Sequence, residues 1–554
     1  MLKDPDLVED AYAAWQKYRA FSQSQVDSIV ESVAAAARAN AQRLAELAVQ
    51  ETGYGNAKDK LAKNLLAAEV LPRAMRGLKT IGILREIPDR KLVEIAVPMG
   101  VVAAILPTTN PTSTAIYKTL ISLKAGNAIV ISPHPRAKIC SCETAAVLQQ
   151  AALQAGAPSG LIQCIGDSTI EATNALMKHP RTGVILSTGG PGIVRAAYSS
   201  GKPAFGVGPG NVPVLLDKSA NVEDAVSKVV EGKSFDFGTL CSSEQTIVAE
   251  RALRDRILSA LKTRKAFLCD ARQTEALGKL LFTPHFTVNP ECVGQSPTKI
   301  AKMAGFEVPS DTSILVVEIA GIGKPHPLSA EKLSPVLSLY FVADFPAALD
   351  ASEAILRFGG LGHTAVIHAT DDARIREFAL RMPAFRILVN TPAPQGSVGI
   401  STGLFPAMTL GCGAAAGNIT GDNIGPLHLI NIKRLAYVTE SPSSSGPDRQ
   451  TVIAAVERYL AKRGFEQPPP VTASVVDRFL AARRGSPALP TPEAPAPHPS
   501  HPIEITDFVC EDDVRRAIAQ SKKIFIGPKT IVTPSARDLA LRSDTLVMTD
   551  RTKQ

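Results

Sequence analysis

Short apolar runs alternate with helix-like segments over much of the chain beyond residue 100, and this alternation limits the folds that it can adopt. The runs of strand length are at 101–106, 127–133, 161–165 and 183–187 and, further on, at 313–319, 337–344, 364–370 and 385–390. Between the first four runs, 137–155 and 170–179 have helical spacing. Strands that alternate with helices form parallel sheets covered on both faces. The sequence therefore predicts an α/β fold with two doubly wound parallel-sheet domains.

Two domains are expected before residue 420. Residues 23–50 and 57–76 have apolar residues at helical spacing and belong to the first domain, which we expect to span 1–233. The second domain is expected at 234–420. With 554 residues, of which 45% are hydrophobic and 20% charged, the chain is long enough for more than one buried core.

The composition changes at residue 440, and 441–554 is expected to be a linker-rich extension carrying short helices. Residues 441–447 are rich in serine and proline, and seven prolines fall within 485–502. Two similar amphipathic segments lie at 452–461 and 475–481, and a third helix is expected near 509–523. Helices this short are marginal alone in water. Their apolar faces are expected to dock either on a partner or on the chain's own globular body.

Composition argues against several classes of function. No apolar run approaches the roughly 20 residues of a membrane helix, and the acidic beginning of the chain is unlike a signal peptide, so a cytoplasmic protein without membrane contact is expected. The net charge of +8 is spread along the chain without a basic block, which disfavours nucleic-acid binding. The eight cysteines include no CxxC pair, so neither a metal site nor a disulfide framework is indicated.

One cysteine is placed where a reactive thiol is expected. Cys241 ends the sequence Gly238-Thr-Leu-Cys241, between a glycine turn and an apolar run. A thiolate that adds to an aldehyde gives a thiohemiacetal whose C–H can leave as hydride, with a thioester as product. A free thiol has a pKa near 8.5, so it needs positive charge or backbone donors around it to react at neutral pH.

Three segments in chain order resemble the aldehyde dehydrogenase superfamily: Pro107-Thr-Thr-Asn110-Pro, the Cys241 segment, and Glu331-Lys-Leu-Ser-Pro-Val336. The resemblance covers about residues 20–440. It implies that Cys241 is the nucleophile and that the Asn110 amide and the Cys241 backbone N–H form the oxyanion hole. It also implies that Glu331 binds the ribose of a nicotinamide cofactor.

The same resemblance assigns the rest of the cofactor site. A strand, a glycine-rich turn and a helix start at 183–199, as in segments that meet a pyrophosphate. NAD is the expected cofactor, although Ser132 stands where hydrolytic members usually have lysine, so NADP remains open. The cofactor-binding residues expected in this way are Ser132, Pro133, Thr188, Gly189, Gly190, Gly208 and Glu331.

An absent carboxylate points to the second substrate. Hydrolytic members have a glutamate before a Gly-Gly pair, whereas the matching segment here, 205–213, has no acidic residue. A thiol nucleophile is therefore expected. The sequence motifs resemble those of the CoA-acylating branch, which implies coenzyme A as co-substrate. His363 is expected either to tune the site or to help deprotonate the CoA thiol. A structural histidine beside a glycine turn is the alternative.

These inferences predict an NAD-dependent oxidation of propanal or acetaldehyde to acyl-CoA. The family implies homo-oligomers joined through a hairpin at 84–98 and a return segment at 421–440. Residues 523–538 resemble tails of bacterial-microcompartment enzymes, which implies shell proteins as partners and a location inside such a compartment. The rival hypotheses are a substituted substrate such as sulfoacetaldehyde, and a non-catalytic scaffold linking shell and cargo.

Overall fold

The structure is a computed structural model that describes residues 5–283, 285–439, 449–462, 505–520, 522–541, 543 and 545–548. The chain divides into two compact units, Met1–Thr439 and Glu440–Gln554. Among the described helices, none combines the length and the apolar character needed to cross a bilayer.

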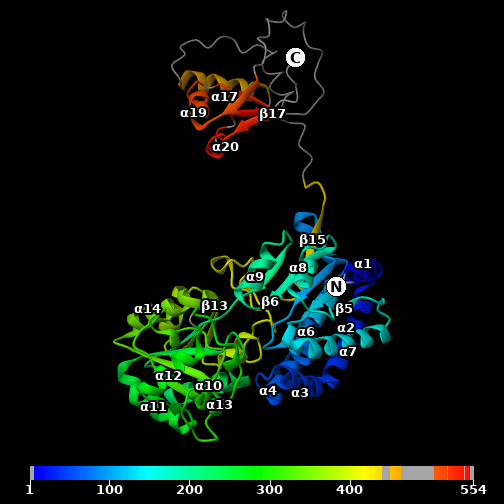
Figure 1. Ribbon diagram of the computed structural model, residues 1–554. Coiled ribbons are helices and arrows are strands. Elements are labelled where there is room, and N and C mark those ends of the chain that lie inside the picture. Colours follow the sequence, from blue (N-terminus) through cyan, green and yellow to red (C-terminus); the bar gives the residue numbers. More distant parts are fainter. Residues whose placement is uncertain are drawn as a thin grey trace, which may run out of the picture. The chain divides into compact units, whose positions relative to one another are not determined.

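A five-stranded parallel sheet forms the first half of the larger unit (Figure 1). Its strands, in spatial order, are β5 (Ile162–Cys164), β4 (Ala128–Ser132), β3 (Val101–Ile105), β6 (Thr182–Thr188) and β7 (Ala204–Val207). The order reverses between β3 and β6. Right-handed crossovers therefore place α6 (Pro111–Lys124) and α7 (Lys138–Gln154) on one face, and α8 (Ile170–Lys178) and α9 (Pro191–Tyr198) on the other. Ligands of such sheets bind at the carboxyl ends of the strands, next to the reversal.

N-terminal helices pack on this first sheet. They are α1 (Pro5–Tyr18), α2 (Gln23–Ala39), α3 (Ala41–Thr52), α4 (Ala57–Leu65) and α5 (Leu71–Met75). The helix α2 contacts α6 and α7, and α1 contacts β3 and β4. Buried alanines and valines of α2 join the same core as the strands.

A seven-stranded parallel sheet forms the second half. Its order is β10 (Phe267–Leu268), β11 (Leu315–Glu318), β12 (Val336–Val342), β9 (Glu244–Glu250), β8 (Val212–Leu216), β13 (Gly362–His368) and β14 (Ala384–Val389). Helices α10 (Val222–Ser234), α11 (Arg254–Thr263), α12 (Ala271–Leu281), α14 (Phe345–Ile355) and α15 (Asp372–Arg381) connect or cover the strands. The strands predicted from the alternation are present in both sheets, with their ends displaced by at most two residues.

A small antiparallel sheet joins distant parts of the larger unit. Strand β2 (Leu92–Pro98) lies between β1 (Ile83–Ile87) and β15 (Ile430–Ala436), so the predicted hairpin is present. The register of β15 runs from Ile430 opposite Pro98 to Ala436 opposite Leu92. The residues of β15 from Asn431 onward are exposed.

The smaller unit contains a sheet that the sequence analysis did not anticipate. Strands β16 (Ile505–Val509), β17 (Ile524–Val532) and β18 (Leu546–Met548) are parallel, with α19 (Glu511–Ala519) and α20 (Pro534–Leu541) between them. Its small core contains Val509, Val514, Ile526, Ala536 and Ala540. The helix α17 (Arg449–Lys462) agrees with the first expected amphipathic segment and α19 with the third, whereas 475–481 lies outside the described residues.

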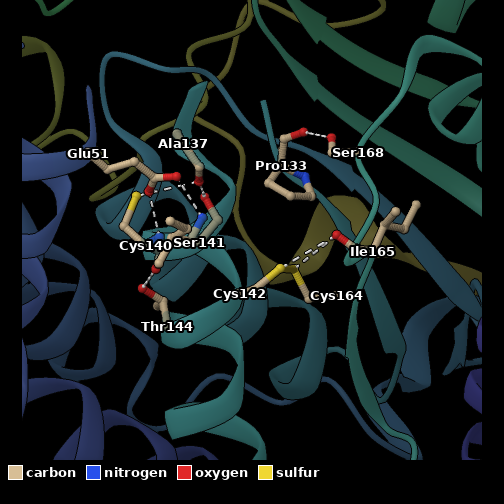
Figure 2. Close-up of a disulfide and its surroundings, with 11 residues drawn as sticks. Glu51, Pro133, Ala137, Cys140, Ser141, Cys142, Thr144, Cys164, Ile165 and Ser168 are labelled. Carbon is tan, nitrogen blue, oxygen red and sulfur yellow. Dashed lines mark hydrogen bonds between the residues drawn. A yellow bond between two sulfur atoms is a disulfide. The ribbon is translucent and has the colours of Figure 1, made fainter. Parts of the chain in front are cut away.

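A disulfide, which the cysteine spacing did not indicate, joins Cys142 on α7 to Cys164 on β5 (Figure 2). The Cα atoms of the two residues are 5.6 Å apart, within the range that a disulfide spans. The expectation of no disulfide was wrong here because the pairing depends on how a helix packs on a strand, which residue spacing does not reveal. Both sulfurs lie close to the Ile165 carbonyl, just after β5.

Candidate active site

Cys241 lies where the two parallel sheets of the larger unit meet. It follows the short turn Phe235–Gly238 and precedes β9, so it is at the amino edge of the seven-stranded sheet. Asn110 and Thr188 follow or end strands at the carboxyl edge of the five-stranded sheet. The fold thus brings the expected nucleophile to the edge at which sheets of this type bind ligands.

The turn before Cys241 has an unusual backbone. Asp236 and Phe237 have φ values of 48° and 53°, in the left-handed region that non-glycine residues rarely adopt, and Gly238 has a φ of 73°. Non-glycine residues in this region cost about 1–3 kcal/mol each and persist where their surroundings hold them. Asp236 is fully buried and heavily hydrogen-bonded, which provides that support.

The imidazole of His363 contacts the thiol. His363 Nε2 is 3.2 Å from Cys241 Sγ, and His363 Nδ1 is 2.9 Å from Thr364 Oγ1. Arg386 Nε donates to the same Thr364 oxygen at 3.3 Å. These four residues form one connected row that ends at the nucleophile, and His363 and Thr364 are completely buried.

The hydrogen-bond pattern assigns the tautomer of His363. Arg386 can only donate, so Thr364 Oγ1 accepts from it. If Nδ1–H also donated to Thr364, the buried hydroxyl proton would be left without a partner, which costs free energy. The network is satisfied when the Thr364 hydroxyl donates to Nδ1, which leaves the proton on Nε2. His363 Nε2–H then donates to the Cys241 sulfur.

Burial opposes ionisation of both members of the pair. Burial raises the pKa of the Cys241 thiol to about 12, and the negative charges of Glu331 and Cys412 add to this, whereas Arg386 acts in the opposite direction. The pKa of His363 is well below its usual value because of burial and the Arg386 charge. The resting pair is therefore neutral, and the thiolate has to be stabilised by hydrogen bonds as it forms.

Arg386 is the buried cation nearest to this chemistry. The residue is 2% exposed, and its guanidinium donates to the carbonyls of Gly411 at 2.6 Å and Gly421 at 3.0 Å. Cys412, which follows one of these glycines, is also 2% exposed, and burial raises the pKa of its thiol to about 11. Arg386 also lines a cavity of about 430 Å³, together with Phe405 and His428.

Asn110 lies at the start of α6 but does not cap it with its side chain. Its Oδ1 accepts a hydrogen bond from Lys63 Nζ at 2.5 Å, and its Nδ2 donates to Thr109 Oγ1 at 3.1 Å. An amide NH2 has two N–H donors. One of them donates to Thr109, and the other has no partner among the hydrogen bonds of the described residues.

Glycine is required where three segments converge beside the nucleophile. A Cβ on Gly210 would lie 2.2 Å from the Cys241 carbonyl oxygen and 3.0 Å from His363 Cγ, so no side chain fits there. The N–H of Gly210 donates to Glu331 Oε1 at 3.2 Å. Burial raises the pKa of Glu331 to about 8. Glu331, the residue expected to bind the ribose, is thus hydrogen-bonded to the Gly210 segment that lies against Cys241.

The glycine-rich turn after β6 can receive a dinucleotide. Thr188 ends β6 and Gly190 immediately precedes α9. A Cβ at Gly190 or Gly208 would meet nothing within 4 Å, so backbone at both positions faces open space. By contrast, a Cβ at Gly189 would lie 2.7 Å from Ile193 of α9, so this glycine allows the tight turn. Backbone N–H groups at a helix start suit a pyrophosphate. These residues fit the implied NAD.

The segment expected at the adenosine end is less open. Ser132 is 1% exposed, and its hydroxyl pairs with Thr173 Oγ1 at 2.8 Å. The Pro133 carbonyl accepts from the Ser168 hydroxyl, in the loop just beyond the disulfide (Figure 2). Because the Thr173 hydroxyl donates to the Thr169 carbonyl, Ser132 donates to Thr173 and keeps only acceptor capacity for a cofactor hydroxyl.

Sequence reasoning did not find several residues of this site. Arg386 reads as a surface residue of an alternating strand, Thr364 as a strand residue, and Cys412 as one cysteine among eight. Their roles depend on carbonyls and hydroxyls brought together by distant loops. Only Gly210 could have been found from the sequence, because residues 205–211 are rich in glycine.

Comparison with known proteins agrees with this architecture. A model described as the aldehyde dehydrogenase family matches residues 5–274. The bifunctional aldehyde-alcohol dehydrogenase AdhE of Escherichia coli (strain K12) is 43% identical over 440 residues, which are 78% of this chain and 49% of that protein. The chain thus spans about half the length of the curated relatives that it matches first.

Two solved structures are similar over nearly their whole length. An acetylating aldehyde dehydrogenase from Geobacillus thermoglucosidasius is 47% identical with a TM-score of 0.78, covering 79% of this chain and 97% of that one. A Rhodopseudomonas palustris propionaldehyde dehydrogenase with bound propionyl-CoA is 30% identical with a TM-score of 0.72, covering 78% and 94%. This chain belongs to the aldehyde dehydrogenase family.

Proposed function

We propose that this protein is a CoA-acylating aldehyde dehydrogenase that converts an aldehyde, CoA–SH and NAD+ into acyl-CoA, NADH and a proton. The observation that carries the proposal is the partly buried contact of Cys241 Sγ with His363 Nε2 at 3.2 Å. A thiol in this setting, beside Asn110 and Glu331, suits aldehyde capture better than any structural role. The names of the similar solved structures support the acylating reaction.

In the first half-reaction, the Cys241 thiol loses its proton to solvent, and the resulting thiolate attacks the aldehyde carbon. The sulfur forms a C–S bond, and the carbonyl oxygen takes the electron pair and becomes an oxyanion. The free N–H of Asn110 and the Cys241 backbone N–H stabilise that charge, as preorganised donors do in other enzymes. His363 Nε2–H stabilises the thiolate before attack. The C=O bond then re-forms as the C–H bond breaks, its electron pair leaves as hydride to the acceptor that bound nicotinamide supplies, and the acyl group remains as a thioester on Cys241.

In the second half-reaction, the CoA thiolate attacks the thioester and Cys241 leaves as a thiolate. Attack by one thiol on the thioester of another is nearly isoenergetic, so no strong driving force is needed. The segment 205–213 supplies no carboxylate to activate water. The assigned tautomer of His363 presents a donor to sulfur, which favours stabilisation of the leaving thiolate over deprotonation of CoA.

A short unsubstituted aldehyde, propanal or acetaldehyde, is the proposed substrate. The rival is an anionic aldehyde such as sulfoacetaldehyde, which needs a cation free to bind it. Arg386 lines a cavity, but its donors are directed to Thr364, Gly411 and Gly421. Because these bonds would have to be given up, Arg386 is poorly suited to hold a sulfonate.

The reaction is tested by NADH formation from propanal and NAD+, with and without CoA, for the wild type and Cys241→Ala. We expect sustained turnover only with CoA and only with Cys241. Equal turnover without CoA would show that water is the acceptor, with Glu331 the first carboxylate to examine as base. A wild type that forms no NADH and whose Cys241 resists alkylation would favour the non-catalytic scaffold.

We further propose that residues 441–554 direct the enzyme to a bacterial microcompartment, and that the enzyme is a homo-oligomer joined through β2 and β15. The likeness of 523–538 to tails of microcompartment enzymes supports the first proposal. The exposure of the β15 residues from Asn431 onward supports the second. Deletion of 441–554 is expected to preserve turnover and abolish co-localisation with shell proteins. A truncated enzyme that still co-purifies with shells would contradict the targeting role.

A further inference from the structure

The amide of Asn110 is useful for catalysis in one orientation only. An asparagine amide can turn by 180° and exchange its oxygen and nitrogen, and only one arrangement points an N–H at a developing oxyanion. In this structure, Lys63 Nζ lies 2.5 Å from Asn110 Oδ1. An ammonium group has three donors and no acceptor. The Lys63 ammonium group is therefore compatible only with the orientation in which the Asn110 amide oxygen faces it.

Lys63 itself has little freedom to move. It is 2% exposed and forms an ion pair with the fully buried Asp236. Asp236 also accepts from Lys60 Nζ at 3.1 Å and from Thr239 Oγ1 at 2.6 Å. A buried ion pair with most of its hydrogen bonds satisfied fixes geometry, and removal of one partner leaves an uncompensated charge.

The anchor of this network is the nucleophile turn. Asp236 has the left-handed backbone described above, and Thr239 is two residues before Cys241. The backbone N–H of Asp236 donates to Asp59 Oδ2 at 2.7 Å, and the Asp236 carboxylate accepts from the Asn56 N–H at 2.8 Å. The turn that presents the nucleophile is thereby tied to the start of α4, and Lys63 projects from the last turn of the same helix.

We propose that Lys63 is a positioning residue that locks the Asn110 amide in its donor orientation and, through Asp236, keeps that amide in register with the Cys241 turn. The role rests on the proposed function, because it needs an oxyanion at Asn110. Nothing in the sequence of α4 distinguishes Lys63 from a surface lysine. Its contacts do so, since they link two catalytic groups that are 131 positions apart (241 − 110).

A double-mutant cycle of Lys63→Met and Asn110→Ala tests this role through aldehyde- and CoA-dependent NADH formation. Lys63→Met is expected to lower kcat about 10- to 100-fold with little change in the KM for aldehyde, somewhat less than the loss of a whole oxyanion donor. In the Asn110→Ala background, the same substitution is expected to cost less than about 3-fold. Losses that multiply in full would overturn the proposal.

Lys60→Met is the matched control. It removes an equally buried ammonium from the same carboxylate, but Lys60 donates to the Thr109 carbonyl and has no contact with the Asn110 oxygen. We expect a similar loss of thermal stability with a much smaller loss of kcat. Equal kcat losses in the two lysine variants would mean that the loss comes from breaking the shared ion pair and not from the contact with Asn110, which would overturn the proposal.

A second readout separates this inference from the proposed function. Alkylation of Cys241 by iodoacetamide needs the thiol but no oxyanion donor, so Lys63→Met should alkylate at the wild-type rate. A parallel loss of alkylation would place the defect in the nucleophile turn and overturn the role through Asn110. If Lys63→Met does not fold, Lys63→Gln, which keeps an N–H donor without the charge, replaces it in the cycle. A wild type without CoA-dependent turnover would refute the function itself.

Discussion

On one flank of Cys241, Lys60 and Lys63 surround the Asp236 carboxylate, whereas on the other the Arg386 guanidinium is held by backbone carbonyls and the Thr364 hydroxyl. The ion pairs of the first flank hold Lys63 against Asn110, and none of these three groups is among the charges that act on the Cys241 thiol. Arg386 instead favours the Cys241 thiolate and disfavours a protonated His363. One flank should govern geometry and the other protonation.

The comparison is tested most strongly by removing one residue from each flank. His363→Ala should lower kcat about 10²- to 10⁴-fold, the range of a lost proton-handling group, and should also slow alkylation of Cys241. Asn110→Ala should lower kcat about 10²- to 10³-fold and leave alkylation unchanged. Steady-state NADH formation and iodoacetamide kinetics measure the two effects. Cys412→Ala is the control for labelling at the wrong thiol.

A smaller loss of kcat is expected from a change that disturbs the tautomer of His363. Thr364→Val removes the hydroxyl that donates to His363 Nδ1 and leaves an Arg386 donor unpaired, at a cost of about 1–3 kcal/mol. We expect kcat and the alkylation rate at neutral pH to fall roughly 10-fold, while Thr364→Ser, which keeps the hydroxyl, restores both. A serine variant as impaired as the valine variant would argue for a packing role.

The smallest predicted effect is a change in pH dependence. Burial holds the pKa of Glu331 at about 8, so its carboxylate is charged above that pH and protonated below it. The charge opposes the Cys241 thiolate. Glu331→Gln should therefore speed alkylation about 2- to 5-fold at pH 9, from a screened interaction of up to roughly 1 kcal/mol, and change nothing at pH 6.5. Acceleration at both values would show that Glu331 ionises at its ordinary pKa.

The sequence predicted the parts of this molecule that have local signals. Runs rich in valine and isoleucine predicted the strands. The motifs around Cys241, Asn110 and Glu331 identified these residues as candidates for the site. The role of Lys63 could not be predicted, because α4 carries three lysines and only the fold decides which of them is buried against Asn110. The small sheet of β16–β18 was not predicted, because the region from residue 441 was interpreted as a linker from its prolines at 485–502, and because Pro528 interrupts the apolar run of β17.

The pairing of β15 with β2 implies a long delay between the synthesis of the two strands. Ile430 pairs with Pro98, so 332 residues (430 − 98) must be added after one strand before the other exists. At about 5–20 residues per second, this takes on the order of 20–70 s. Throughout that interval β2 has one unpaired backbone edge, the kind of edge that recruits strands from other chains. Nascent copies on one messenger would therefore benefit from a chaperone, or from a neighbouring copy, before the return strand arrives.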